Sequence, residues 1–316
     1  MHQTHKKRSH NAAKAAASPA QTTGLDERTR QARQLLRACI LCPRRCGVDR
    51  LAGQTGTCLA PARAVVSDYG PHHGEEAVLV GRGGSGTLFF SHCNLRCVFC
   101  QNWPIAHEGQ GQEVSEEQLA AMMLELQDRG CHNINLVTPT PFLAPILSAV
   151  RLARDRGLRL PLCYNTSGYE DPQILALLDG IVDIYLPDMK TTDPATARQL
   201  FDAPDYPGWA RASLLEMHRQ VGDLVTDARG VAARGLLIRH LVLPNRLAGT
   251  PAFASWVVQH LSPDTVVHIM AQYRPEYRAM ETKELARRIT PEEYDEAVRQ
   301  ARYAGLTHLL CDRPAG

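Results

Sequence analysis

Residues 81–102 read GRGGSGTLFFSHCNLRCVFCQN, in which an apolar run, Thr87–Phe90, is followed at once by three cysteines. The run predicts a β-strand, so Cys93, Cys97 and Cys100 are expected on the loop that leaves its carboxyl end. Enzymes built on parallel sheets carry their sites at that end of the strands. We therefore expect this loop to form the centre of a functional site.

Similar apolar, partly β-branched runs recur along the chain. They predict strands over Ile134–Val137, Leu160–Tyr164, Val182–Leu186, Leu236–Leu243 and Thr265–Met270. Helices are predicted after a capping box at Ser115 and Gln118, after a cap at Thr290, and over residues 209–224 and 251–261. Alternating strands and helices predict a parallel sheet with right-handed crossovers. Six strands are fewer than the eight of a full barrel, so the expected fold class is α/β, a partial (β/α)6 barrel.

The composition is that of an ordinary globular protein: 316 residues, 44% hydrophobic, 22% charged, with a formal net charge of +2. Residues 1–22 hold four basic residues and no acid, which leaves 31 Lys and Arg against 33 Asp and Glu in the remainder. This balance predicts no nucleic-acid-binding surface on the folded part. No uncharged apolar run reaches about 18 residues, and no secretory signal is evident. We expect a cytoplasmic protein with no membrane or nucleic-acid partner.

The ten cysteines are concentrated, with seven of them between Cys39 and Cys100. A secreted disulfide scaffold spreads its cysteines through a short chain, whereas thiolates in a reducing compartment persist and bind metal. Residues 1–24 lack apolar periodicity and are predicted as a disordered tail. Residues 25–75 are predicted as a four-cysteine module that binds a metal or a cluster, and residues 76–316 as the barrel.

The two cysteine groups differ in the number of ligands they offer. The loop spacing C-x3-C-x2-C brings together three thiolates, one fewer than a structural zinc site needs. Three thiolates suit a [4Fe-4S] cluster whose fourth iron takes an exogenous ligand. The earlier group has four cysteines within 20 residues, namely Cys39, Cys42, Cys46 and Cys58. Four thiolates close either a structural Zn²⁺ site or an accessory [4Fe-4S] cluster, and their spacing does not separate these two.

The run CNLRCVFCQN resembles the cluster loop of the radical SAM superfamily, most closely its pyruvate formate-lyase-activating-enzyme-like subgroup. Other segments resemble uncharacterised iron–sulfur proteins of that subgroup: CILCPRRCGVDR (39–50), NINLVTPT (133–140), YNTSGY (164–169), VDIYLPDMK (182–190), RHLVLPN (239–245) and MAQYRP (270–275). The resemblance implies a cluster on Cys93, Cys97 and Cys100 that binds and reductively cleaves S-adenosylmethionine (SAM). The resulting 5′-deoxyadenosyl radical would abstract hydrogen from a substrate.

The resemblance also implies partners. A low-potential electron donor such as flavodoxin or ferredoxin would reduce the cluster. The substrate would be a glycine of a glycyl-radical enzyme, another protein side chain or a small molecule. In the best-known glycyl-radical activators, extra cluster cysteines follow the three-cysteine loop, whereas here they precede it. That departure leaves the substrate open.

Bound SAM presents an amine, a carboxylate, ribose hydroxyls and adenine, so polar side chains in or after successive strands are candidate contacts. They are Thr138, Asn165, Ser167, Asp188, Lys190, His240 and Gln272. In related activating enzymes an Asp-x-Lys at the corresponding strand end contacts the cofactor. By that resemblance Asp188 would accept from the ribose or amine, and Lys190 would pair with the carboxylate. The structural alternatives are turn and capping roles, a solvated ion pair, and a buried core position for His240.

Two non-catalytic functions remain as alternatives. An iron–sulfur electron carrier or redox sensor would use clusters without SAM, and a zinc-containing interaction protein would make the three-cysteine loop incidental. The isolated Cys131, Cys163 and Cys311 are predicted as buried structural thiols. A radical-relay role is the alternative for Cys163, which lies close to the expected site.

Overall fold

The computed structural model describes residues 19–312, so the calls on residues 1–18 and 313–316 lie outside the described part of the chain. In residues 19–312 ten strands form a sheet in the order β10-β9-β8-β6-β5-β4-β2-β1-β3, and β7 pairs with β8 off this path. The strands are β1 (Ala64–His72), β2 (Ser85–Phe90), β3 (Gln112–Val114), β4 (Ile134–Val137), β5 (Leu162–Thr166), β6 (Ile184–Pro187), β7 (Val225–Thr226), β8 (Ala232–Leu241), β9 (Val266–Met270) and β10 (Leu309–Cys311).

The helices are α1 (Pro19–Gln34), α2 (Ala77–Val80), α3 (Trp103–Ala106), α4 (Glu116–Asp128), α5 (Leu143–Asp155), α6 (Pro172–Leu175), α7 (Pro194–Phe201), α8 (Tyr206–Val221), α9 (Thr250–His260) and α10 (Pro291–Tyr303). Both predicted caps are confirmed. Ser115 accepts from the amide of Gln118 at the start of α4, and Thr290 accepts from the amide of Glu293 at the start of α10. These local signals depend only on neighbouring residues and are readable from sequence.

The predicted α/β class with a parallel sheet is confirmed. Each neighbouring pair along β2, β4, β5, β6, β8, β9 and β10 is parallel. The sheet has one more parallel strand than expected, because β10 is only three residues long and too short to recognise as an apolar run. β1 and β3 extend the sheet beyond β2 in antiparallel fashion. Strands β5 and β6 are buried along their whole length, as expected for a parallel sheet covered on both faces.

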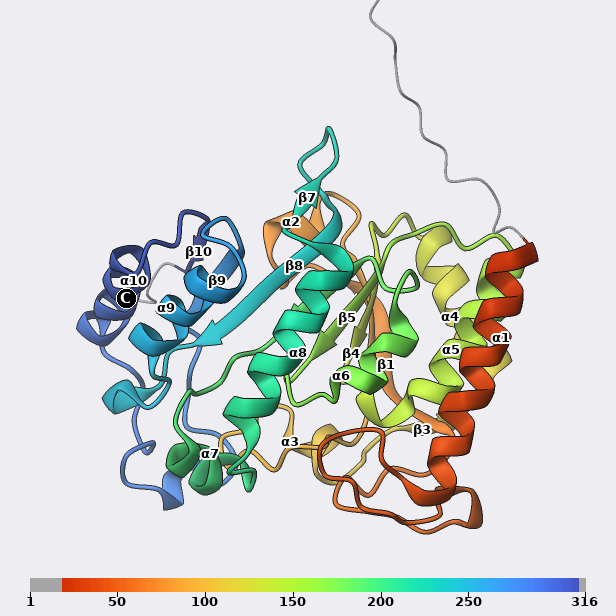
Figure 1. Ribbon diagram of the computed structural model, residues 1–316, viewed down its shortest axis with the longest axis horizontal. Coiled ribbons are helices and arrows are strands. Elements are labelled where there is room, and N and C mark those ends of the chain that lie inside the picture. The colour runs from red at the N-terminus through yellow and green to blue at the C-terminus, as the bar shows by residue number, and fades with distance from the viewer. Residues whose placement is uncertain (1–18, 313–316) are drawn as a thin grey trace, which may run out of the picture.

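The carboxyl ends of the parallel strands share one side of the molecule. In Figure 1 they point to the lower side of the view, where α3, α7 and the orange-red cysteine-rich segment lie. No helix within residues 19–312 is long and apolar enough to cross a membrane.

Three elements lie at other bounds than the expected ranges. Helix α1 begins at Pro19, within the predicted tail 1–24. Strand β1 falls inside the predicted module 25–75 but pairs with β2 and belongs to the main sheet, because its residues Val65 and Val66 are buried in the common core. Strand β5 begins and ends two residues later than predicted, so that Asn165 lies within the strand rather than after it.

Candidate functional site

The three-cysteine loop, residues 91–102, leaves β2 and is anchored by backbone hydrogen bonds to two distant segments. The amide of Ser91 donates to the carbonyl of Val65 at 2.9 Å, and the amide of Val98 donates to the carbonyl of Leu200 at 2.9 Å. Both contacts bridge residues far apart in the chain. The loop conformation is therefore set by the barrel around it.

A cavity of about 890 Å³ opens beside this loop, and Cys93, Cys97 and Cys100 all line it. Side chains in or just after β4, β5, β6, β8, β9 and β10 also line it, together with Phe89 of β2 and the segment between β1 and α2. The volume is in the upper part of the range of about 300–1,000 Å³ that is common for small-molecule pockets. The predicted convergence of the loop with the strand ends is thus present in the fold.

The environment of the three thiols has two opposing effects on their ionisation. Burial raises the pKa of the Cys93 thiol to about 11, and it also raises the pKa values of Cys97 and Cys100. The backbone amide of Leu95 donates to the sulfur of Cys93 at 3.4 Å, and the ammonium of Lys190 lowers the pKa of all three thiols. Three soft ligands with N–H and cationic support fit an iron–sulfur cluster, which binds thiolates.

Six of the seven predicted SAM contacts line the same cavity. They are Thr138, Asn165, Ser167, Asp188, Lys190 and Gln272. The Nζ of Lys190 lies 2.5 Å from Oδ2 of Asp188, and their side chains are only 17% and 24% exposed. Burial alone would lower the pKa of Lys190, but the charges of Asp188 and Cys97 hold it above its ordinary value. The pair is therefore not the solvated surface pair that was the alternative.

The backbone around this ion pair is positioned by Tyr206, which sequence analysis did not single out. Its hydroxyl accepts from the amide of Lys190 and lies 3.0 Å from the carbonyl oxygen of Ser167. Beside it, Gly168 has φ +79°, and a Cβ there would lie 2.2 Å from the carbonyl oxygen of Asp188. The turn after β5 thus approaches the chain after β6 at a distance that only glycine permits. A lone tyrosine opening a helix carries no sequence signal for this role.

His240, the seventh predicted contact, lies outside the cavity. It is fully buried, and its two ring nitrogens lie 2.7 Å from the carbonyl oxygen of Met189 and 3.0 Å from the hydroxyl of Thr250. Its ring stacks on Phe253 of α9. Successive residues of a strand point to opposite faces, and His240 points toward the helices. The structure therefore corrects the prediction that His240 contacts SAM and places it in the core.

Of the three isolated cysteines, two lie in the core and one lines the cavity. Cys131 and Cys163 are buried as predicted, and Cys163 does not line the cavity. Cys311 is exposed and lines the cavity, so the prediction of a buried thiol is wrong there. The reason is its place in β10, the last strand of the sheet, which has a neighbour on one side only.

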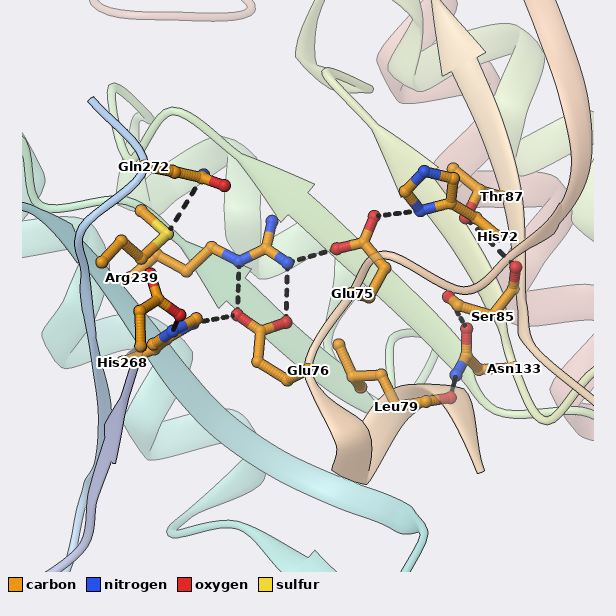
Figure 2. A network of polar contacts seen from close by, with 12 residues as sticks. His72, Glu75, Glu76, Leu79, Ser85, Thr87, Asn133, Arg239, His268 and Gln272 are labelled. Carbon is orange, nitrogen blue, oxygen red and sulfur yellow. Dashed lines mark hydrogen bonds and ion pairs between the residues drawn. The ribbon is translucent and has the colours of Figure 1, made fainter. Parts of the chain in front are cut away.

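A group of buried charges that sequence analysis did not select also lines the cavity (Figure 2). We call Glu75, Glu76, Arg239, His268 and Asp312 the charge network. Arg239 donates from Nε to Glu76 at 2.8 Å and from Nη2 to both Glu75 and Glu76. His268 lies 2.7 Å from Glu76 through Nδ1 and 2.9 Å from Asp312 through Nε2.

The network also shifts the ionisation of its members. Burial would raise the pKa of Glu76, but hydrogen bonds from His268 and Arg239 hold it well below its ordinary value. Burial would lower the pKa of His268, and Glu76 and Asp312 raise it instead. Glu76 and Arg239 are 163 residues apart in the chain, so no local pattern signals their pairing.

Comparison with known proteins agrees with this geometry. The family model of the radical SAM superfamily matches residues 87–222. An uncharacterised protein of Methanocaldococcus jannaschii is 31% identical over 287 residues, which cover 88% of this chain and 78% of the relative. This chain belongs to the radical SAM superfamily. Membership implies a [4Fe-4S] cluster and SAM as cofactors, and the matches reach the superfamily but not its activating-enzyme-like subgroup.

Three solved structures align with part of this chain. The structure of Streptococcus suis SuiB bound to SAM has a TM-score of 0.46 and 11% identity, covering 70% of this chain and 48% of that one. SuiB bound to its precursor peptide SuiA gives the same TM-score and identity, with 46% of that chain covered. The structure of anSMEcpe with AdoMet and the Cp18Cys peptide has a TM-score of 0.43 and 10% identity, covering 69% and 60%. The chain thus spans about half to three-fifths of these proteins.

The second cysteine group of this radical SAM chain, which we call the cysteine module (residues 39–58), packs against the three-cysteine loop. Arg44 donates to the carbonyl of Asn94 at 2.9 Å, and Arg96 donates to the carbonyl of Thr57. Within the module, the amide of Thr57 donates to the sulfur of Cys46 at 3.4 Å. The two cysteine groups are therefore neighbours at the same side of the barrel.

Metal occupancy of both groups remains a prediction. Among residues 19–312, no three His, Cys, Asp or Glu side chains are close enough together to share one metal ion. In a [4Fe-4S] cluster each protein thiolate binds a different iron, so cluster ligands need not converge on one ion.

Proposed function

We propose that this chain is a radical SAM enzyme in which Cys93, Cys97 and Cys100 hold a [4Fe-4S] cluster and the cavity holds SAM. The observation that carries the proposal is the convergence of these thiols with six predicted SAM contacts on one cavity. When bound and reduced, the cluster would supply the electron for the reductive cleavage of SAM. A low-potential donor such as flavodoxin or ferredoxin would provide that electron.

The ion pair of Asp188 and Lys190 would orient SAM. Lys190 offers an ammonium that pairs with the SAM carboxylate, and Asp188 offers acceptor oxygens for the amine or a ribose hydroxyl. Because Tyr206 holds the backbone of both neighbouring turns, these charges would be in place before SAM arrives. Thr138 and Asn165, on the cavity wall beside them, would complete the polar contacts.

The four cysteines of the module would hold a second metal site, either Zn²⁺ or a [4Fe-4S] cluster. Arg50 is 2% exposed, and its Nη1 lies 3.9 Å from the sulfur of Cys39. A buried guanidinium beside a thiolate offsets part of the formal −2 charge that either four-thiolate site carries. The packing of the module on the three-cysteine loop supports a structural role in holding that loop.

The resemblance to the activating-enzyme-like subgroup supports glycyl-radical activation as a finer form of this proposal. That activity requires a peptide segment of a large partner to enter the cavity. It would be tested by incubating the reduced enzyme and SAM with a glycyl-radical enzyme and looking for the protein radical by electron paramagnetic resonance.

The main experiment is anaerobic reconstitution with iron, sulfide and zinc counted per chain. Electron paramagnetic resonance of the reduced protein is then recorded before and after SAM is added. We expect a signal that shifts with SAM, because one iron of the loop cluster is open to it. Cys97→Ala should abolish the shift while leaving the metal of the cysteine module in place.

Cys131→Ala is the matched control, since this buried thiol lies outside both groups and its variant should keep the shift. A fully assembled cluster that is indifferent to SAM would contradict the proposal and leave the electron-carrier alternative.

A further inference from the structure

The cavity has two chemically different parts. The predicted SAM contacts Thr138, Asn165 and Lys190 lie at β4, β5 and after β6, whereas the predicted contact Gln272 follows β9 and lies beside the second part. The charge network occupies the part beside β8, β9 and β10, joined by the segment between β1 and α2 (Figure 2). None of its five members is among the predicted SAM contacts. The network therefore needs an explanation of its own.

Four members of the network are largely buried and Asp312 is 33% exposed, and one nitrogen of Arg239 is unpaired within the described residues. The side chains of Glu76, Glu75 and Arg239 are 2%, 8% and 15% exposed. Buried charges destabilise a fold unless they are paired and hydrogen-bonded. Arg239 nevertheless uses only Nε and Nη2, and within residues 19–312 its Nη1 has no hydrogen-bond partner although Arg239 lines the cavity. Figure 2 shows this third nitrogen without a dashed line.

A second unpartnered group lies in the same interior. Asn135 of β4 is fully buried, and neither atom of its amide has a partner in the described residues. It is two residues from Val137, which lines the cavity, and so faces the same side of the sheet, although Asn135 itself does not line the cavity. Buried polar groups in native proteins are hydrogen-bonded, so an unsatisfied amide beside a cavity points to a missing ligand or ordered water.

The formal charges of the network indicate whether that ligand is a cation or an anion. Glu75, Glu76 and Asp312 bring three negative charges, and Arg239 brings one positive charge. His268 brings at most one more, and so does His72, whose Nδ1 lies 3.2 Å from Oε1 of Glu75. The formal charge therefore lies between −2 and 0, in surroundings where charge is poorly screened. It is never positive, so the network accommodates a cation better than a phosphate or a dicarboxylate.

We propose that the charge network is the substrate subsite of the proposed radical enzyme. It takes a small molecule that carries an ammonium or guanidinium group and an acceptor oxygen. Glu75 already contacts His72 and Arg239, and Asp312 contacts His268 and accepts from the amide of Ala271. Both carboxylates line the cavity and would bind the cation through their remaining lone pairs, and Nη1 of Arg239 would donate to the acceptor. The inference rests on the proposed function, since the substrate must share the cavity with SAM. SAM would occupy part of the cavity of about 890 Å³, and the remainder is the space available to this small molecule.

The test uses three probes of one chain length that differ only at one end: 6-aminohexanoate, 6-hydroxyhexanoate and adipate. Their dissociation constants are measured by calorimetry on the reconstituted full chain with SAM present. We expect 6-aminohexanoate to bind at least tenfold more tightly than the other two. Equal affinities, absence of measurable binding by all three, or tighter binding of adipate would overturn the proposal.

Substitutions of single residues test whether the network carboxylates cause the preference for 6-aminohexanoate. Glu75→Gln keeps the side-chain shape and removes one negative charge, so the preference for 6-aminohexanoate should fall at least tenfold. Glu113→Gln removes an exposed carboxylate far from the cavity and should leave the preference unchanged. If Glu75→Gln does not fold, Asp312→Asn serves in its place, because that side chain is 33% exposed and less constrained.

The same samples separate this proposal from the proposed function. Glu75→Gln should retain the SAM-dependent resonance shift, because the network is not a SAM contact. Loss of the shift in that variant would assign the network to SAM and overturn the substrate subsite. A wild-type protein without any shift would contradict the radical function, while the probe preference would still report on the charge of the cavity. Binding of the cationic group only within a peptide would overturn the small-molecule assignment.

Discussion

At the scale of single residues, Gly168 is the position where the backbone geometry of the site is most constrained. Gly168→Ala adds a Cβ at φ +79° and places it 2.2 Å from the carbonyl oxygen of Asp188. The positive φ alone costs about 1–2 kcal/mol. The contact forces the strand ends apart, so we expect a further loss of about 1 kcal/mol in unfolding free energy and weaker SAM binding.

Gly180 offers the matched control for this prediction. It has φ +72°, and a Cβ there would meet nothing within 4 Å. Gly180→Ala should therefore lose only the about 1–2 kcal/mol of unfolding free energy that the positive φ costs, and it should keep its SAM affinity. Denaturant unfolding and equilibrium dialysis of SAM measure both effects, and equal behaviour of the two variants would contradict the proposed role of the contact.

Glu170 is a buried carboxyl group in the connection between β5 and α6, and its ionisation should affect stability. It is 1% exposed and accepts hydrogen bonds from the hydroxyls of Thr140 and Thr166. Burial raises its pKa to about 7. A raised pKa favours the protonated form in the folded state, so this stabilisation is complete below about pH 4 and is lost as the pH rises through 7.

The shift corresponds to about 3 kcal/mol between pH 4 and pH 8. Glu170→Gln keeps the acceptor oxygen and cannot ionise, so it should be more stable than the wild type at pH 8, and the gain should shrink toward pH 5. Unfolding free energies across this range check the prediction. Parallel pH profiles of the two proteins would show that Glu170 does not titrate near neutrality.

At the scale of elements, Arg44 connects the cysteine module to the three-cysteine loop and to the end of α7. It donates to the carbonyl of Asn94 at 2.9 Å and to that of Phe201 at 3.1 Å. Hydrogen bonds from charged groups contribute about 1.5–3 kcal/mol each. Arg44→Ala should therefore accelerate amide hydrogen exchange in the three-cysteine loop by at least about tenfold.

Arg63→Ala is the control, because Arg63 is 61% exposed and its nearest acid, Glu113, lies at 3.8 Å. Exchange in the loop should be unchanged in that variant. Unchanged exchange in Arg44→Ala as well would show that the module does not stabilise the loop.

At the scale of the whole molecule, the two cysteine groups lie on the same side of the barrel but draw their ligands from separate segments (Figure 1). Replacing Cys42 and Cys58 together by Ser should remove the metal of the module and lower the thermal stability. The SAM-dependent resonance shift should remain, since its thiolates lie on the other segment. Metal analysis and resonance spectra check this, and loss of both metals would indicate a single shared site.

The sequence alone determined the local features of this protein. The α4 and α10 caps, the short apolar runs of most parallel strands and the C-x3-C-x2-C spacing all depend on residues within one turn, strand or loop of each other. The convergence of strand ends followed from the rule that carboxyl ends of parallel strands share one edge, and six of the seven predicted SAM contacts lie on the cavity by that rule. The boundaries of the module and the short β10 were not readable, because neither has a local signal.

Only the tertiary structure decided which face of β8 serves the cavity. Arg239 and His240 are consecutive and both polar, yet Arg239 lines the cavity and His240 packs in the core. Strand alternation predicts that they point apart but not which of them points inward. The charge network depends on contacts between residues 163 and 192 positions apart. Such pairs form only when the whole chain packs, so no periodicity or spacing within a single segment predicts them.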